Sequence, residues 1–156
     1  MLLTRRSLLS AAVASPVVML SATPVLALSG QYYNENGVAI DGSDPVAYFT
    51  VGAPTAGARE ISYEWAGQAW WFASEENRAA FIADPEAYAP QYGGYCAWAM
   101  AQDSGYVAST TPEAWAIVDG KLYLNFSRRI QRRWARDIPG HIVAGDRNWP
   151  AVSQTV

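Results

Sequence analysis

The sequence predicts an α+β fold in which a small antiparallel sheet of hairpins packs with several short helices. Two observations carry this prediction. Aromatic, β-favouring runs occur in two pairs, each pair joined by a short turn signal, and several helical segments follow a Ser or Asp that can cap them. The chain has 156 residues, of which 51% are hydrophobic and 16% charged, and this composition is typical of one globular domain.

Residues 1–27 are expected to be an export signal that is removed. The pair Arg5-Arg6 precedes an apolar segment, and "VLA" at the end of the leader is a small-residue cleavage sequence. The apolar segment is too short for a membrane span. The paired arginines resemble a twin-arginine signal, with the Sec route as the alternative. We therefore expect a periplasmic or secreted protein, one mature domain over residues 28–156, and no stable membrane anchor after cleavage.

The first half of the mature chain predicts a strand, a short helix, a hairpin and a capped helix. The run "VAI" favours a strand, after which Ser43 or Asp44 caps a short helix with Pro45 in its first position. The runs "ISYEWA" and "AWWFA" meet at Gly67 and predict a hairpin. Ser74 then caps the helical segment "EENRAAFIAD", and the following "DP" starts another turn.

The second half predicts a buried helix, a second hairpin and a C-terminal helix. "GYCAWAMA" has the composition of a buried helix that begins after a Gly-Gly pair, and Asp119-Gly120 is a type I′ turn signal between two apolar strands. Ser127 caps "RRIQRRWARDI", in which apolar residues recur every four positions. Pro139-Gly140 is expected to end this helix, and the rest to form one or two further helical turns.

Four of these segments together resemble a YHS domain. They are "DGSDPVAYF" (41–49), "WAGQAWWFASEENRAAFIADPEAYAPQYGGYCAWA" (65–99), "AWAIVDGKLYLNF" (114–126) and "RRWARDIPGHI…NWP" (132–150). They are most similar to a branch of small exported bacterial YHS proteins with a twin-arginine leader. The resemblance covers most of the mature chain and implies the α+β fold described above, but it supplies no activity for this branch.

Another branch of that family handles metals through cysteine thiolates, in a pattern that resembles "DPVCGM" followed later by "YFCS..C". In this chain the matching positions are Ala47, Ala73 and Asn77. Since all these cysteines are absent, the resemblance does not imply that metal site here.

Cys96, Met100 and His141 form a separate candidate metal site. Cys96 and Met100 are four residues apart, so a helix would present thiol and thioether on one face. Soft sulfur ligands and imidazole suit Cu(I) in a two- or three-coordinate site, and a helix N-terminus would lower the pKa of the Cys96 thiol. The alternatives are that both sulfur residues only fill the core, or that Cys96 is a redox-active thiol, the enzymatic reading of this sequence.

The single cysteine excludes an intramolecular disulfide and a Cys₄ or Cys₂His₂ zinc site. The clusters "DGSDP" and "YGGYC" are candidate pocket walls for a small ligand, because glycine lets backbone approach closely and polar side chains lie beside it. The pocket candidates are Asp44, Tyr48, Tyr92, Gly93, Gly94 and Tyr95. Trp70 and Trp71 must point to opposite faces of a strand, so one of them is expected to be exposed or in a groove. A tryptophan there can stack on a sugar or another ring, and the alternative is core packing or a covered second face of the sheet.

An arginine cluster surrounds the apolar stripe of the C-terminal helix and is a candidate face for an anion or a protein partner, with a solvated charged face as the alternative. Its members are Arg128, Arg129, Arg132, Arg133 and Arg136. The whole chain has 11 Lys+Arg against 14 Asp+Glu, which argues against general nucleic-acid binding. We expect a binding module for a small ligand or soft metal, copper first, with a thiol-based redox protein and a protein-interaction module as alternatives.

Overall fold

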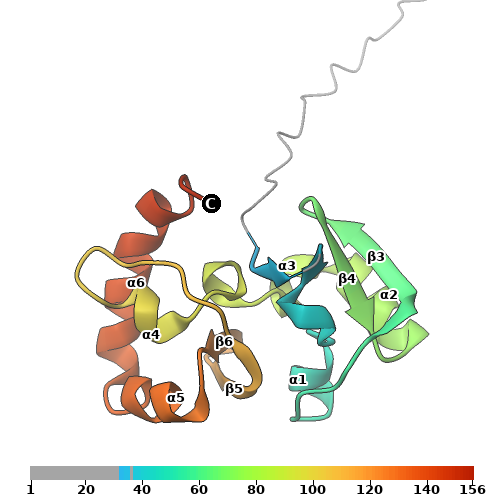
Figure 1. Ribbon diagram of the computed structural model, residues 1–156. Coiled ribbons are helices and arrows are strands. Elements are labelled where there is room, and N and C mark those ends of the chain that lie inside the picture. The colour runs from blue at the N-terminus through green and yellow to red at the C-terminus, as the bar shows by residue number, and fades with distance from the viewer. Residues whose placement is uncertain (1–31, 36) are drawn as a thin grey trace, which may run out of the picture.

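The computed structural model describes residues 32–35 and 37–156, and the expected export signal lies outside them. The fold is α+β, as the sequence predicts, with two small sheets and several short helices. Figure 1 shows α4, α5 and α6 on one side of the molecule, the sheet that contains β3 and β4 on the other, and the hairpin of β5 and β6 between them. No helix in the described part of the chain is long and apolar enough to cross a membrane.

The first sheet has the strand order β1-β2-β4-β3, with strands Asn34–Glu35, Val38–Ala39, Gln68–Phe72 and Ala58–Trp65 in that order. β3 and β4 form the predicted hairpin, whose two-residue turn has positive φ at both Ala66 and Gly67. β2 pairs with β4 in parallel, so this sheet is mixed. The ladder between β3 and β4 is interrupted between Ala58 and Ser62, which lets this part of β3 bend away from its partner.

The second sheet is the predicted hairpin of β5 (Thr111–Val118) and β6 (Lys121–Asn125). Asp119 and Gly120 both have positive φ, as a type I′ turn requires. Successive residues of β6 face opposite sides. Leu122 and Leu124 enter one hydrophobic core while Tyr123 enters the other, so this strand is the wall between the two cores.

Four of the eight helices in the described part of the chain begin at a side-chain cap that the sequence supplies. Ser74, Asp84, Ser127 and Asp137 each accept a hydrogen bond from a backbone N–H three residues later. The helices are η1 (Ile40–Gly42), α1 (Ala47–Thr50), α2 (Glu75–Ala83), α3 (Pro85–Tyr88), η2 (Gln91–Gly94), α4 (Ala97–Met100), α5 (Arg128–Trp134) and α6 (Ile138–Val152).

The predicted end of the C-terminal helix is wrong. α5 already ends at Trp134, and Pro139 lies in the first turn of α6 rather than after a helix. Proline is tolerated there because the first helical N–H groups have no intrahelical partner. The Asp137 carboxylate accepts from the Gly140 N–H at 3.0 Å and starts this 15-residue helix.

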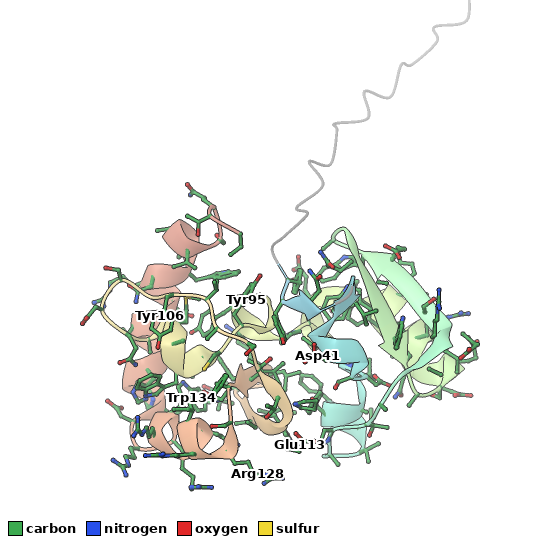
Figure 2. The ribbon with its side chains drawn as sticks, in the orientation of Figure 1. Asp41, Tyr95, Tyr106, Glu113, Arg128 and Trp134 are labelled. Carbon is green, nitrogen blue, oxygen red and sulfur yellow. The ribbon has the colours of Figure 1, made fainter. Side chains whose placement is uncertain are left out.

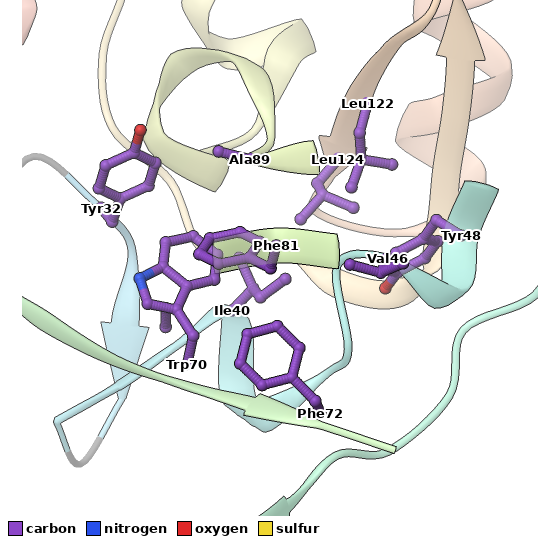
Figure 3. Close-up of a cluster of buried hydrophobic side chains, with 11 residues drawn as sticks. Tyr32, Ile40, Val46, Tyr48, Trp70, Phe72, Phe81, Ala89, Leu122 and Leu124 are labelled. Carbon is purple, nitrogen blue, oxygen red and sulfur yellow. The ribbon is translucent and has the colours of Figure 1, made fainter. Parts of the chain in front are cut away.

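The described residues form two hydrophobic cores. The first core is rich in aromatic rings and lies between the first sheet, α2 and β6 (Figure 3). Within it the ring centroid of Phe81 lies 5.1 Å from that of Trp70 and 5.2 Å from that of Phe72. The second core lies under α4, α5 and α6, and its buried members are Tyr92, Ala97, Met100, Tyr123 and Trp134.

Candidate functional site

The Asp44 carboxylate ties three elements together inside the protein. Its side chain is fully buried. One oxygen, Oδ1, accepts from the backbone N–H groups of Val46 and Ala47 at the start of α1. The other, Oδ2, accepts from the Ala73 N–H at 2.8 Å and from the Asn77 side-chain amide at 2.6 Å. Four donors thus compensate the burial of this carboxylate.

These contacts bring together the three positions that the resemblance aligns with the cysteines of a metal-handling branch of YHS proteins. Ala47 is distant in sequence from Ala73 and Asn77, which are four residues apart, yet each of the three donates a hydrogen bond to Asp44. Here the space around them is organised by a carboxylate and amides rather than by thiolates. Asp44 is therefore a structural tie within the fold, and it is not directed at a ligand.

Tyr48, a second predicted pocket residue, is also used inside the first core. Its side chain is buried, its hydroxyl donates to the Pro112 carbonyl at 3.1 Å, and its ring lies 5.3 Å from that of Trp115. Burial raises the pKa of Tyr48 to about 12.

Tyr92 and Gly93 of the "YGGYC" cluster line a hollow, which we call the tyrosine hollow, whereas the predicted pocket residues Gly94 and Tyr95 do not line it. Tyr92, Gly93 and Gly94 all have positive φ, so the chain turns sharply there. A Cβ at Gly94 would lie 2.7 Å from Ile40 Cγ2, which explains the need for glycine. The hollow measures about 280 Å³ and is lined by Tyr32, Glu86, Ala89, Pro90, Gln91, Tyr92, Gly93 and Trp149.

The two tyrosines of this cluster have different roles. The Tyr92 hydroxyl lies 3.0 Å from Asp146 Oδ1 and 3.2 Å from the Ile142 carbonyl, and burial together with that carboxylate strongly raises its pKa. The Tyr95 ring lies 5.7 Å from that of Tyr33 and 6.4 Å from that of Trp149. The hydroxyl of Tyr92 thus fastens η2 to α6.

The Cys96 thiol is buried immediately before α4. Its sulfur accepts from the Phe126 N–H at 3.3 Å and lies 3.9 Å from Asn125 Oδ1. Burial raises the pKa of Cys96, and the opposing effect of nearby backbone N–H groups is smaller. The expected lowering of this pKa is therefore wrong, because α4 is a single turn and the thiol is deeply desolvated.

The other two candidate metal ligands lie in the second core or beside it. Met100 is fully buried one helical turn beyond Cys96. His141 is half-buried on α6, and its Nδ1 lies 2.8 Å from the Trp134 carbonyl. A carbonyl can only accept, so Nδ1 carries the proton and Nε2 is the nitrogen that neutral His141 can offer to a ligand. Among the described residues, no three His, Cys, Asp or Glu side chains gather closely enough to hold a metal ion.

A larger depression lies on the outer side of the first sheet, and we call it the tryptophan groove. It measures about 650 Å³ and is lined by Gly37, Val38, Asp41, Arg59, Ser62, Glu64, Ala69 and Trp71. Trp70 is buried in the first core, whereas its neighbour Trp71 is half-buried in the groove. The prediction that these tryptophans face opposite sides, with one of them in a groove, is confirmed.

Close backbone packing fixes the position of Trp71. Gly42 has a φ of +75°, and a Cβ there would lie 2.8 Å from the indole ring. A Cβ at Gly57 would lie 2.4 Å from the Trp71 carbonyl carbon. The Gly57 N–H also donates to the Gly42 carbonyl at 2.8 Å, so two chain segments close over Trp71. The indole is held in place without a ligand, as a preformed binding surface requires.

The groove carries charges of both signs around this indole. Across the hairpin Ser62 is paired with Trp71, and Glu64 with Ala69. Arg59 comes from the interrupted part of β3, and Asp41 from η1, where its carboxylate accepts from the Tyr33 hydroxyl at 3.4 Å. The one ion pair among the described residues joins Arg78 to Glu75, so neither Arg59 nor Glu64 is neutralised by a carboxylate or cation within this part of the chain.

The arginines lie as the sequence predicts, on the outer side of α5. Figure 2 shows Arg128 on that side and Trp134 toward the interior. A hollow of about 500 Å³, the arginine hollow, is lined by Arg129, Arg132, Arg133, Ala135 and Arg136.

Comparison with known proteins leaves this geometry as the main guide to function. No protein-family model, curated protein or solved structure matches the chain.

Proposed function

We propose that the chain is an exported binding module of the YHS type, and that it holds a small polar ring compound, a sugar unit, in the tryptophan groove. The observation that carries this proposal is the combination of a fixed, half-buried indole with an arginine, a carboxylate and a hydroxyl around one depression. Binding sites of this kind join an apolar surface to a few well-placed polar groups.

The YHS part of the proposal is supported by the contacts of Asp44. A metal site built from the family's three cysteine positions requires that these positions converge. Ala47, Ala73 and Asn77 do so around one carboxylate in this chain.

The choice of ligand follows from the chemistry of the groove. The indole face of Trp71 offers apolar contact to the C–H face of a ring. Arg59 donates hydrogen bonds in a fixed fork, Glu64 accepts them, and Ser62 does both. A ring with several hydroxyl groups uses all of these at once, whereas a purely apolar ligand would leave the charged groups desolvated without partners.

The soft-metal hypothesis at Cys96, Met100 and His141 stays a prediction. The neutral His141 ring leaves Nε2 unprotonated, as a metal ligand requires. Burial raises the pKa of the Cys96 thiol, so a Cu(I) ion would have to displace the thiol proton before it could bind. The thiol-redox hypothesis has the same obstacle, since the thiolate is the reactive form.

The proposal is tested by titrating the mature protein with glucose, galactose, N-acetylglucosamine and their disaccharides, using calorimetry and tryptophan fluorescence. We expect Glu64→Gln and Arg59→Ala each to weaken binding by about tenfold, the loss of one charge-assisted hydrogen bond. Both side chains are exposed, so these variants should fold normally. The matched control is Glu113→Gln, an exposed glutamate on β5 that does not line the groove. Equal binding by all variants, or no binding to any sugar of the panel, would contradict the proposal.

A further inference from the structure

The arginine cluster concentrates positive charge on one short segment of an acidic protein. Five arginines occur within nine residues, and no acidic residue lies among them. Four of the five line one hollow of about 500 Å³. The cluster is therefore a confined site rather than an even distribution of surface charge. Its members are Arg128, Arg129, Arg132, Arg133 and Arg136.

The inner contacts of α5 fix the direction of this charged face. Trp134 is fully buried in the second core, and Ile130 is half-buried on the same side. Gln131 donates its side-chain amide to the Trp115 carbonyl and so fastens α5 to β5. At 100° per residue, the four arginines of α5 occupy an arc of about 140° on the opposite side, and Arg136 follows one turn later.

The arginines lack carboxylate partners in the described part of the chain. The ion pair found there joins Arg78 to Glu75, so none of the five guanidinium groups has a carboxylate within 4.0 Å among these residues. Asp137, the acid next in sequence, accepts from the Gly140 N–H at the start of α6. The arrangement instead places arginines three and four residues apart, where like charges destabilise a helix.

The position of the charges in α5 adds to this cost. The first turn of α5 has no acidic residue and begins with two arginines, although the helix dipole favours negative charge there. An anion bound in the hollow would offset the mutual repulsion of the arginines that line it.

We propose that the arginine hollow binds a phosphate group. Guanidinium forks match the oxygens of phosphate in a bidentate geometry and keep their charge at all relevant pH values. The positive charge is confined to one nine-residue segment and the rest of the chain is acidic, which favours a small, strongly charged group over an extended polyanion. Phosphate of this kind occurs in free phosphate esters and in phospholipid headgroups. The site is independent of the tryptophan groove, since the two depressions share no lining residue.

The experiment compares two double variants that remove the same charge. Arg132→Gln/Arg136→Gln changes the hollow, and Lys121→Gln/Arg147→Gln changes exposed residues outside it. Binding of pyrophosphate and of glycerol 3-phosphate is measured by calorimetry. Binding to vesicles is measured by sedimentation, with phosphatidylglycerol against phosphatidylcholine. We expect the hollow variant to lose at least about tenfold in affinity and the control variant less than about twofold, because only the first removes bidentate partners.

The results identify the source of the phosphate as well as the site. Binding to the soluble probes indicates a phosphate ester, and binding only to phosphatidylglycerol vesicles indicates a headgroup. Pyrophosphate should also raise the melting temperature of the wild type but not that of the hollow variant. Equal losses in the two double variants would show general charge attraction and overturn the proposal, as would absence of binding to every probe.

Discussion

The two cores differ in whether their buried polar atoms have hydrogen-bond partners. In the first core the Asp44 carboxylate has four donors, the Tyr48 hydroxyl has the Pro112 carbonyl, and the Trp70 indole N–H donates to the Trp65 carbonyl at 3.0 Å. In and beside the second core, the Asn125 Nδ2 and Trp134 Nε1 atoms are buried without a hydrogen-bond partner in the described part of the chain. One region is saturated with hydrogen bonds and the other is not.

The unsatisfied atoms lie next to the reactive candidates of the sequence. Asn125 Oδ1 accepts from the Trp98 N–H at 3.2 Å and lies 3.9 Å from the Cys96 sulfur, while its amide nitrogen has no partner. The Trp134 carbonyl accepts a hydrogen bond from His141 Nδ1, while the Trp134 indole N–H has no partner among the described residues. An unpaired buried polar atom costs about 1–3 kcal/mol. The buried polar atoms of the first core thus contribute hydrogen bonds to the fold, whereas Asn125 Nδ2 and Trp134 Nε1 contribute none among the described residues.

The largest effect is expected where the first core is broken at Asp44. Asp44→Ala leaves three backbone N–H groups and the Asn77 amide without their acceptor, and should lower the free energy of unfolding by about 4 kcal/mol. The measurement is urea unfolding followed by circular dichroism. Asp84→Ala, which removes the cap of α3 at an exposed position, should cost about 1 kcal/mol and serves as the control.

A double-mutant cycle sharpens this test. Asp44→Asn alone places its new amide N–H groups against the Ala73 N–H and the Asn77 amide, which are also donors. Asn77→Asp alone places a second carboxylate beside that of Asp44. The combined variant restores an amide–carboxylate pair in the reverse direction and should recover part of the loss. If the two single effects simply add, Asp44 does not act through Asn77.

A smaller effect is expected from buried tyrosines at alkaline pH. Burial raises the pKa of Tyr48 to about 12, compared with about 10 in an unfolded chain. The folded state therefore keeps this proton while the unfolded state loses it, so stability is complete below about pH 9 and declines between about pH 10 and 12. Burial also raises the pKa of Tyr92 in the second core.

Substitution by phenylalanine should expose these contributions. Tyr48→Phe loses a hydrogen bond to Pro112, about 1 kcal/mol at pH 7, yet should show a shallower decline in unfolding free energy at pH 11. Tyr92→Phe should show the same pattern in the second core. The control Tyr106→Phe changes a half-exposed residue. A decline that is equally steep in all three variants would exclude the buried tyrosines as its cause.

The fold could be predicted from local signals because its hairpins and caps depend on a few residues each. Asp119-Gly120 fixes one turn, and Ser74 and Ser127 fix two helix starts. The misplaced boundary at Pro139 has a physical cause, since proline either follows a helix or begins one. Asp137, which can cap a helix, was the signal that decides between these possibilities.

The candidate sites were predicted only in part. The sequence predicts the hairpin but sets its turn at Gly67-Gln68, whereas the observed turn at Ala66 and Gly67 sets the register that pairs Ser62 with Trp71 on one side of the tryptophan groove. The positions of Arg59 and Asp41 do not follow from the hairpin. Arg59 lies where the ladder between β3 and β4 is interrupted, and Asp41 reaches the groove because β2, which precedes η1, pairs with β4. The role of Asp44 as a tie to Ala73 and Asn77 also depends on tertiary contacts that no local pattern contains.

A similarly small effect on stability, and the sharpest test of the second core, is expected from Cys96→Ala. The thiol borders a hollow of about 80 Å³, so its loss should cost only about 1 kcal/mol in unfolding free energy. In the native wild type the thiol should react slowly with a thiol reagent near pH 7, because burial raises its pKa, and should titrate fully on unfolding. Copper analysis of protein purified after export decides between the remaining roles. Copper bound by the wild type and absent from Cys96→Ala would make this cysteine a metal ligand, and equal copper in the two proteins would leave it a core residue beside an unsatisfied asparagine.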